Sequence, residues 1–209
     1  MSVLDVGCGG GFTLFHLSRA RLVSRYLGLD LNVERLRPRY EHISVPHEFK
    51  NLDLDTNWDF GEHDVVWCSE TLEHLTDDHG VFAKICRSTK PNGLIVVTMP
   101  SLTHRRRLGK SFPEFLAMPA NQDGPSHVRI GYDETSLNSL AAGTCAQLMR
   151  IDAISRCDRA YYRRRYLWPA AAQIIHNIWV TMRQTPSDRF IFAPDDFSQH
   201  QSIAAVYCT

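Results

Sequence analysis

The chain has 209 residues, which suits one domain or a domain with an added lobe. Its 23 Lys and Arg balance its 23 Asp and Glu, so no overall positive field favours nucleic acid or an anionic membrane. No apolar run is long enough to cross a bilayer, and the opening strand-like segment leads us to expect no signal peptide.

Six cysteines are scattered along the chain without a Cys-x-x-Cys pair. This pattern predicts reduced core thiols in a cytoplasmic protein. They are Cys8, Cys68, Cys86, Cys145, Cys157 and Cys208.

The first segment combines a strand, a glycine turn and a helix. Residues 2–6 are short and mostly apolar, as a buried parallel strand requires. Gly7, Gly9 and Gly11 follow at alternate positions, and apolar residues recur at helical spacing from Phe12. Glycines permit unusual backbone angles and leave room for a ligand, while a helix N-terminus offers free N–H groups. The unit therefore predicts a cradle for a nucleotide-like ligand.

A second strand over residues 26–30 ends in Asp30, 19 residues after Gly11. An open α/β fold places an acid there to accept hydrogen bonds from ribose hydroxyls. The alternative is an ordinary helix-capping aspartate. We expect Asn32 to cap a short helix that Pro38 limits.

Two further strands continue the alternation. Residues 47–52 form a weaker strand that leads into an Asp-rich turn, and residues 64–69 form a strongly apolar one. Asp77 or Asp78 then begins a helix, and the turn at residues 90–93 leads into a fifth strand over 94–99. Five strands alternating with helices predict a doubly wound parallel sheet.

The second half is less regular. Residues 102–125 form a long connection beyond a strand end, which we interpret as a lid or substrate loop. Asp133 caps a helix that Gly143 ends, a sixth strand covers 147–155, and a seventh covers 202–208. The basic cluster of the lid comprises Arg105, Arg106, Arg107 and Lys110.

Three motifs together resemble those of the class I S-adenosylmethionine-dependent methyltransferases. They are the Asp-x-Gly-x-Gly-x-Gly pattern from Asp5 to Gly11, the segment DVVWCSETLEHL from Asp64, and the segment KPNGLIVVTMP from Lys90. The resemblance covers residues 2–101 well and 127–155 loosely. It implies an α/β fold with a mostly parallel seven-stranded sheet, an antiparallel last strand and helices on both faces. A nicotinamide oxidoreductase is disfavoured because Phe12 replaces the third glycine of the dinucleotide fingerprint.

The resemblance also implies a cofactor-binding set for S-adenosyl-L-methionine. The glycine loop would hold the methionine end, Asp30 the ribose, Asp53 and Leu54 the adenine, and Ser69 and Glu70 would border the methyl group. An equally weighted alternative for the neighbouring Asp55 is a solvated turn. The full set is Asp5, Gly7, Cys8, Gly9, Asp30, Leu31, Asp53, Leu54, Ser69 and Glu70.

Candidate catalytic bases are His74 and His127, and less favourably His104, because an oxygen or nitrogen nucleophile often loses a proton during methyl transfer. The alternative for His74 is a polar residue that orders a helix start. Glu70, Glu73 and His74 fall on one face of a helical turn. With His127 they are similar to the magnesium site of small-RNA 3′-end 2′-O-methyltransferases, so a divalent metal is possible there, although no metal ligand is assigned.

We expect a single domain over residues 1–209. It would divide into a cofactor-binding half (1–101), a lid and substrate half (102–155) and an insertion (156–201). The insertion carries a predicted helix over 169–183. This helix packs on the sheet or against a second subunit, or the insertion forms a basic and aromatic surface that recognises a lipid-linked or aromatic substrate or sits at a membrane interface.

Helices that precede the first strand in the family have no counterpart here. Either they are missing from this chain, or the pocket is open or completed by another chain. The sequence predicts a methyltransferase that acts on a small, sugar-linked or glycolipid-like acceptor, with oxygen as the favoured acceptor atom. The alternative functions are a non-catalytic partner subunit and a metal-assisted RNA-end 2′-O-methyltransferase, although the neutral charge makes nucleic acid an unfavoured partner. The chain could also assemble as a dimer or with a partner subunit.

Overall fold

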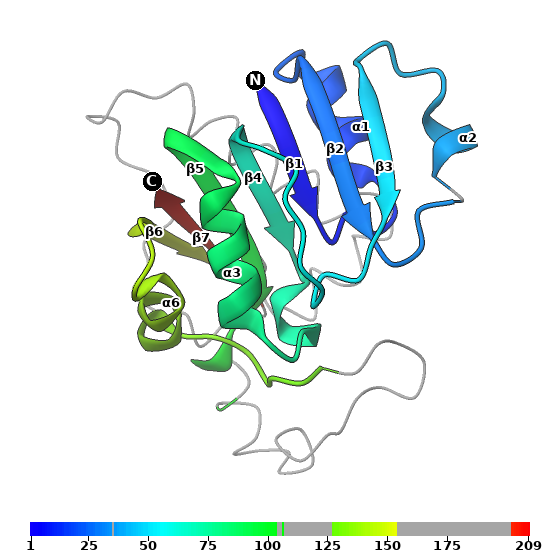
Figure 1. Cartoon of the computed structure of the whole chain (residues 1–209). Coiled ribbons are helices and arrows are strands. Elements are labelled where there is room, and N and C mark those ends of the chain that lie inside the picture. The colour runs from blue at the N-terminus through cyan, green and yellow to red at the C-terminus, as the bar shows by residue number, and fades with distance from the viewer. Residues whose placement is uncertain (35, 104–105, 107–126, 154–201) are drawn as a thin grey trace, which may run out of the picture.

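A computed structural model describes residues 1–34, 36–103, 106, 127–153 and 202–209. Within these residues seven strands form one sheet in the order β3-β2-β1-β4-β5-β7-β6. Figure 1 shows β1 between β2 and β4, with the chain ends at the same end of the sheet. The strands are β1 (Ser2–Val6), β2 (Arg25–Asp30), β3 (His47–Asn51), β4 (His63–Ser69), β5 (Thr89–Pro100), β6 (Gln147–Ala153) and β7 (Ser202–Cys208).

Strand direction confirms the expected topology. The first five strands pair in parallel, whereas β7 is antiparallel to both β5 and β6. The carboxyl ends of β1, β2, β3 and β4 therefore meet at one edge of the sheet. Ligands bind at this edge in open α/β folds.

Helices cover both faces of the sheet, as Figure 1 shows. Alternation along β1 sends Leu4 into one apolar cluster and Val3 into the other. The first cluster includes side chains of α3 and α6, and the second includes side chains of α1 and α2. The helices are α1 (Phe12–Arg19), α2 (Arg37–Tyr40), α3 (Asp78–Arg87) and α6 (Glu134–Ala141), with a 3-10 turn, η1 (Leu72–His74).

Helix ends follow the expected chemistry in two cases. Asp77 caps α3 by accepting the Gly80 N–H at 2.8 Å, and Asp133 caps α6 by accepting the Ser136 N–H at 3.0 Å. Gly143, at φ +76°, follows the last turn of α6.

The cap expected at Asn32 is wrong. Helix α2 begins later, at Arg37, and Pro38 lies in its first turn rather than limiting its end. Proline suits that place because the N–H it lacks would have no partner within the helix.

The fifth strand also begins earlier than expected. His63 pairs with Thr89 but Val65 pairs with Leu94, so the residues expected as a turn form a bulge inside β5. Asn92 has φ +62° there, and its N–H donates to the Thr209 carbonyl at 2.8 Å. Backbone pairing with the chain end keeps this segment within the sheet.

The expected cysteine core is confirmed in part. Cys8, Cys68 and Cys86 are buried and free, Cys208 is half-buried, and Cys145 is exposed. Cys145 follows the exposed turn that ends α6, so its side chain has no core to enter. Cys157, most of the lid and the insertion of residues 156–201 lie outside the described residues.

A carboxylic acid lies in the middle of the sheet. Asp5 is 1% exposed and accepts a 2.5 Å hydrogen bond from the Tyr26 hydroxyl. Burial raises the pKa of the Asp5 carboxyl from its ordinary 3.8 to about 6, although hydrogen bonds from Tyr26 and Thr13 oppose the rise.

We expect an Asp5→Asn variant to be more stable than the parent above pH 6. Folding favours the protonated form of Asp5. The contribution of this side chain to the free energy of unfolding is therefore complete below about pH 3.8 and is lost as the pH rises through about 6. Each tenfold change in proton affinity is worth about 1.4 kcal/mol, which gives a difference of about 3 kcal/mol. Urea unfolding of both proteins between pH 4 and pH 8 measures it.

The matched control is Asp64→Asn. Asp64 accepts hydrogen bonds from Lys90 Nζ at 2.7 Å and from the Ser2 N–H at 2.6 Å, and these hold its pKa well below the usual range. Its contribution is lost as the pH falls, opposite in sign to that of Asp5. An Asp5→Asn stability curve parallel to the parent's would contradict the prediction.

Candidate functional site

The glycine loop after β1 is held against the end of β2. The N–H groups of Gly7 and Cys8 both donate to the Leu29 carbonyl, at 2.8 and 3.0 Å. The Gly9 N–H donates to Asp30 Oδ2 at 2.9 Å. These bonds bring the predicted glycine loop and the predicted ribose acid together at one place.

Two glycines of this loop have different surroundings. Gly7 has φ +76°, and a Cβ on it would lie 2.2 Å from Thr71 Oγ1, so the protein itself fills that space. Gly9 has φ +49°, and a Cβ on it would meet nothing within 4 Å. The loop is therefore closed toward β4 at Gly7 and open at Gly9, where a ligand could approach its backbone.

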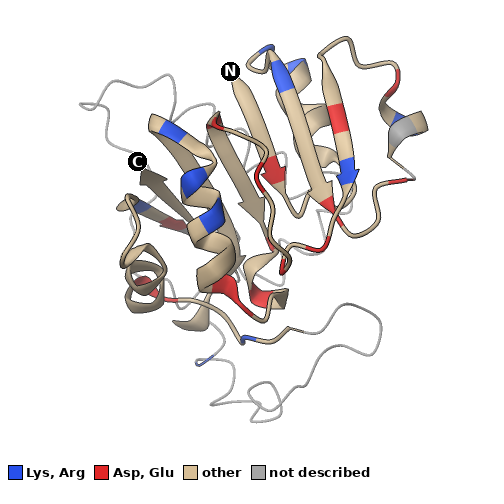
Figure 2. Cartoon of the chain, viewed as in Figure 1, with Lys and Arg blue, Asp and Glu red and all other residues tan. Residues whose placement is uncertain are grey.

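The end of β2 carries the next expected residues. Leu31, directly after Asp30, is 67% exposed. The Leu52 N–H donates to the Asp30 carbonyl at 2.9 Å, which brings the turn with exposed Asp53 next to Asp30. Acidic residues near the carboxyl ends of β1 and β2 are visible in Figure 2.

Three of the expected cofactor residues have buried side chains. Asp5 is 1% exposed, and both Cys8 and Leu54 are 6% exposed. The Leu54 carbonyl accepts from Trp58 Nε1 at 3.2 Å and from Lys84 Nζ at 3.0 Å, which anchors the Asp53 turn. The buried side chains of these residues support the loops from the protein interior. A ligand could reach these residues only at their backbone atoms, or after the loops move.

The end of β4 has a distorted backbone. Glu70 adopts φ +48°, which is unfavourable for a residue with a side chain. Its N–H donates to the Thr98 carbonyl at 2.8 Å, and its Oε1 accepts from the Thr98 hydroxyl at 3.2 Å. Ser69 Oγ lies 2.7 Å from the same Thr98 hydroxyl, so β5 holds both residues.

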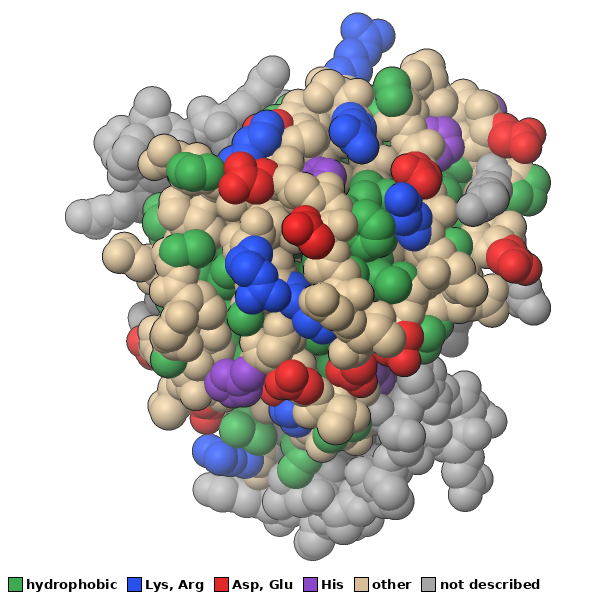
Figure 3. Space-filling view, viewed as in Figure 1, with side chains coloured by type: hydrophobic (Ala, Val, Ile, Leu, Met, Phe, Trp, Pro, Cys, Tyr) green, Lys and Arg blue, Asp and Glu red, His purple; other side chains and the backbone are tan. Residues whose placement is uncertain are grey.

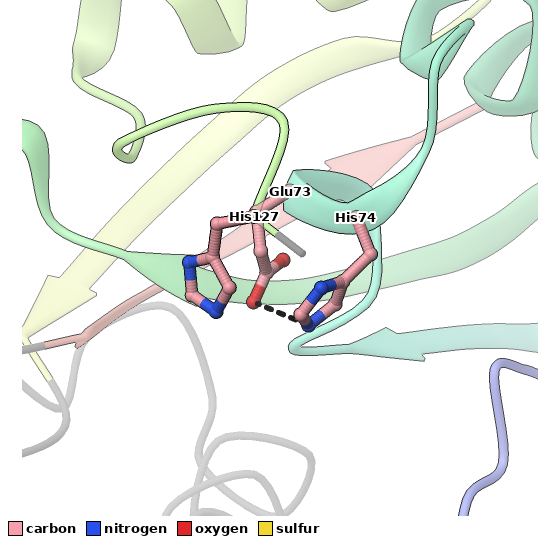
Figure 4. A group of neighbouring side chains, drawn as sticks. All are labelled: Glu73, His74 and His127. Carbon is pink, nitrogen blue, oxygen red and sulfur yellow. Dashed lines mark ion pairs between the residues drawn. The ribbon is translucent and has the colours of Figure 1, made fainter. Parts of the chain in front are cut away.

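The 3-10 turn η1 follows directly and brings the two predicted bases together. The His74 and His127 rings lie 4.5 Å apart between centroids and almost perpendicular, at 88°. Glu73 is 1% exposed, and its Oε1 lies 3.9 Å from His74 Nε2. Figure 4 shows the three side chains converging, His127 from the segment that leads to α6 and the other two from η1.

Thr71 connects this histidine pair to the glycine loop. Its side chain occupies the space beside Gly7, and its carbonyl accepts the His74 N–H at 3.0 Å. The loop at the end of β1 and the histidine pair are therefore neighbours through one residue.

The metal site suggested at Glu70, Glu73 and His74 is not supported. Among the described residues, the group whose nitrogen or oxygen atoms lie within 4.8 Å of one another is Glu73, His74 and His127. Glu70 is not in that group, because its left-handed backbone and its bond to Thr98 direct it toward β5.

Sequence reasoning missed three residues of the site. Thr71 packs on Gly7, Thr98 holds Ser69 and Glu70, and the Tyr40 hydroxyl donates to the Gly10 carbonyl at 2.6 Å. Thr71 stands within the quoted fourth-strand motif and could have been singled out, but Tyr40 lies in α2 with no sequence signal to link it to the loop.

Charge is mixed over the surface. On the face seen in Figure 3, basic and acidic side chains are interspersed, in keeping with equal numbers of each in the chain. In the part of the chain that the structure describes, no helix has the length and apolar character needed to cross a membrane.

Comparison with known proteins gives a family match over the first half of the chain. Residues 4–97 match the family model described as a methyltransferase domain. The ubiquinone biosynthesis O-methyltransferase of Thiobacillus denitrificans is 35% identical over 98 residues, which cover 44% of this chain and 41% of that protein. The chain thus matches less than half the length of such relatives.

Solved structures share the fold of this chain. An S-adenosylmethionine-dependent methyltransferase from Mesorhizobium loti has a TM-score of 0.63 at 15% identity, covering 100% of this chain and 90% of that one. The N-methyltransferase NodS from Bradyrhizobium japonicum, solved with S-adenosyl-L-homocysteine, has a TM-score of 0.57 at 14% identity. That match covers 100% of this chain and 77% of NodS.

The residues present fit the cofactor that this family implies. An open loop at Gly9, with its N–H bound to the Asp30 carboxylate, lies at the sheet edge where parallel α/β folds bind nucleosides. An exposed Leu31 offers an apolar surface beside that carboxylate. Residues 4–97 therefore match a methyltransferase domain, and the described sheet has the fold of the S-adenosylmethionine-dependent methyltransferases.

Proposed function

We propose that this protein transfers a methyl group from S-adenosylmethionine to a hydroxyl oxygen of a small, sugar-linked or lipid-linked acceptor. One observation carries the proposal: Thr71 joins the open glycine loop to the paired histidines His74 and His127. A cofactor cradle and two imidazoles thus share one end of the sheet. Relatives named for O-methylation in ubiquinone biosynthesis support oxygen as the acceptor atom.

In this proposal the adenosyl part of the cofactor lies along the ends of β2 and β3. The Asp30 carboxylate has accepting capacity beyond its bonds to the Gly9 and Asn32 N–H groups, and it would receive the ribose hydroxyls. Leu31 would pack against the adenosyl group, and Asp53 would accept from the adenine amino group. Leu54 would act by anchoring the Asp53 turn, since its own side chain is buried.

The loop at Gly7 and Gly9 would receive the methionine end, with Asp5 and Cys8 supporting it from below. Ser69 and Glu70 would border the methyl group. When bound, S-adenosylmethionine supplies an electrophilic methyl group on a sulfonium and leaves as S-adenosylhomocysteine. Holding the acceptor oxygen in line with that methyl is the main task of the protein.

His74 or His127 would take the proton from the acceptor hydroxyl as the oxygen–carbon bond forms. Both rings are half-buried, so each retains access to a ligand. The Glu73 carboxylate lies 3.9 Å from His74 Nε2, beside the ring that would take the proton. A general base of this kind contributes about 10²–10⁴-fold to a rate.

The ribose role is tested by Asp30→Ala. We expect S-adenosylhomocysteine to bind about 10- to 100-fold more weakly, because a hydrogen bond to a charged group is worth about 1.5–3 kcal/mol. Isothermal titration calorimetry measures the affinity. Asp59→Ala is the matched control, because Asp59 is an exposed aspartate that also accepts a backbone N–H, and equal affinity in all three proteins would refute the ribose role.

The open cradle is tested by Gly9→Ala. The new methyl group meets no protein atom but occupies the space at the loop, so cofactor affinity should fall at least tenfold. Backbone strain at φ +49° should cost about 1 kcal/mol of stability.

Gly143→Ala provides the control, because Gly143 also has a positive φ, of +76°, and open surroundings, but it follows α6. Both variants should lose similar stability in thermal melts, and only Gly9→Ala should lose affinity. Unchanged calorimetric affinity in Gly9→Ala would place the cofactor elsewhere.

The base is tested with radiolabelled S-adenosylmethionine and defined acceptors. Catechol and methyl glucoside offer aromatic and sugar hydroxyls, and a short RNA with Mg²⁺ offers a terminal ribose. On the acceptor that is methylated, His74→Ala or His127→Ala should lower kcat about 10²-fold or more, with cofactor affinity unchanged.

Exposed His79→Ala is the control for this experiment. Full activity in both His74→Ala and His127→Ala would remove the base from the proposal. Cofactor binding without transfer to any acceptor would favour a partner-subunit role.

A further inference from the structure

The segment that carries His127 is bound at several points to the rest of the fold. The N–H groups of Val128 and Arg129 donate to the Glu73 carbonyl, at 2.8 and 3.2 Å. Further along the same segment, the Tyr132 N–H donates to the Pro100 carbonyl at 2.8 Å. The segment therefore joins η1 to the end of β5.

A buried carboxylate lies at the centre of this arrangement. Asp78, at the start of α3, is 3% exposed. Its Oδ1 lies 2.7 Å from Arg129 Nη2, and its Oδ2 accepts from the Tyr132 hydroxyl at 2.8 Å. Both partners come from the His127 segment, so one acid holds that segment at two residues.

Arg129 also binds the chain between η1 and α3. Its guanidinium donates to the Leu75 carbonyl, and to the Thr76 carbonyl at 3.0 Å. A planar guanidinium with several fixed donors locks the relative position of the groups it bridges. Here it fixes the segment of His127 against the chain that directly follows His74.

We propose that Asp78, Arg129 and Tyr132 are positioning residues that fix the His127 ring against His74. The expected effect on the rate of methyl transfer rests on the proposed function. The placement of the His127 ring does not depend on the reaction. These residues would act through His127 and would touch neither the acceptor nor the cofactor.

The test compares Arg129→Ala with the parent by NMR of histidine-labelled protein. Rings whose centroids are 4.5 Å apart give a nuclear Overhauser effect (NOE) between their protons, and we expect Arg129→Ala to lose more than half of its intensity. Variants His74→Ala and His127→Ala assign the signals. Arg129→Lys, which keeps the charge but not the planar fork, should restore part of the NOE.

The matched control is Arg150→Ala. Arg150 also forms a partly buried ion pair, with Asp152 at 2.5 Å, but both residues lie in β6 and neither belongs to the Asp78, Arg129 and Tyr132 group. The Arg150→Ala variant should keep the full NOE, and its change in melting temperature is measured alongside that of Arg129→Ala. Should Arg129→Ala fail to fold, Tyr132→Phe removes only the hydroxyl and carries the same comparison.

Kinetics on whichever probe acceptor is methylated provides the second readout. Arg129→Ala should lower kcat at least tenfold and leave the KM for S-adenosylmethionine within twofold of the parent's. A parental NOE in Arg129→Ala, or in Tyr132→Phe where that variant replaces it, would overturn the inference. Loss of the NOE with no methyl transfer by the parent would confirm the clamp and refute the proposed reaction instead.

Discussion

The hydrogen bond from the Gly9 N–H to the Asp30 carboxylate is the interaction on which the candidate site depends. It forms because β1 and β2 are parallel neighbours, which places both carboxyl ends at one edge. The Leu29 carbonyl adds two bonds to the same loop. A carboxylate and a bent glycine backbone thereby form one surface before any ligand arrives.

A second set of contacts extends this surface toward the other half of the sheet. Thr71 fills the space beside Gly7 and holds the backbone of His74. The Glu73 carbonyl then receives the segment of His127. The glycine loop, the end of β4 and the approach to α6 are thus joined by short contacts, so the proposed cofactor and base positions are mechanically linked.

Much of the fold could be predicted because its signals are local. Apolar runs broken by Gly, Asp and Pro marked most strands, and Asp77, Asp133 and Gly143 marked helix ends. One exception arose from a distant partner, because the bulge at Asn92 is paired with Thr209. The other is α2, which begins at Arg37 although Asn32 resembles a cap.

The sequence by itself determined that a glycine loop, an acid at the end of β2 and His74 would occur at strand ends, with His127 ahead of a helix, because strand alternation and turn residues are properties of short segments. Only the tertiary structure decided which side chains face outward. Leu54 and Cys8 are buried, Glu70 is directed to Thr98, and His127 meets His74 from 53 residues away. Such pairings depend on packing between elements, and no local pattern encodes them.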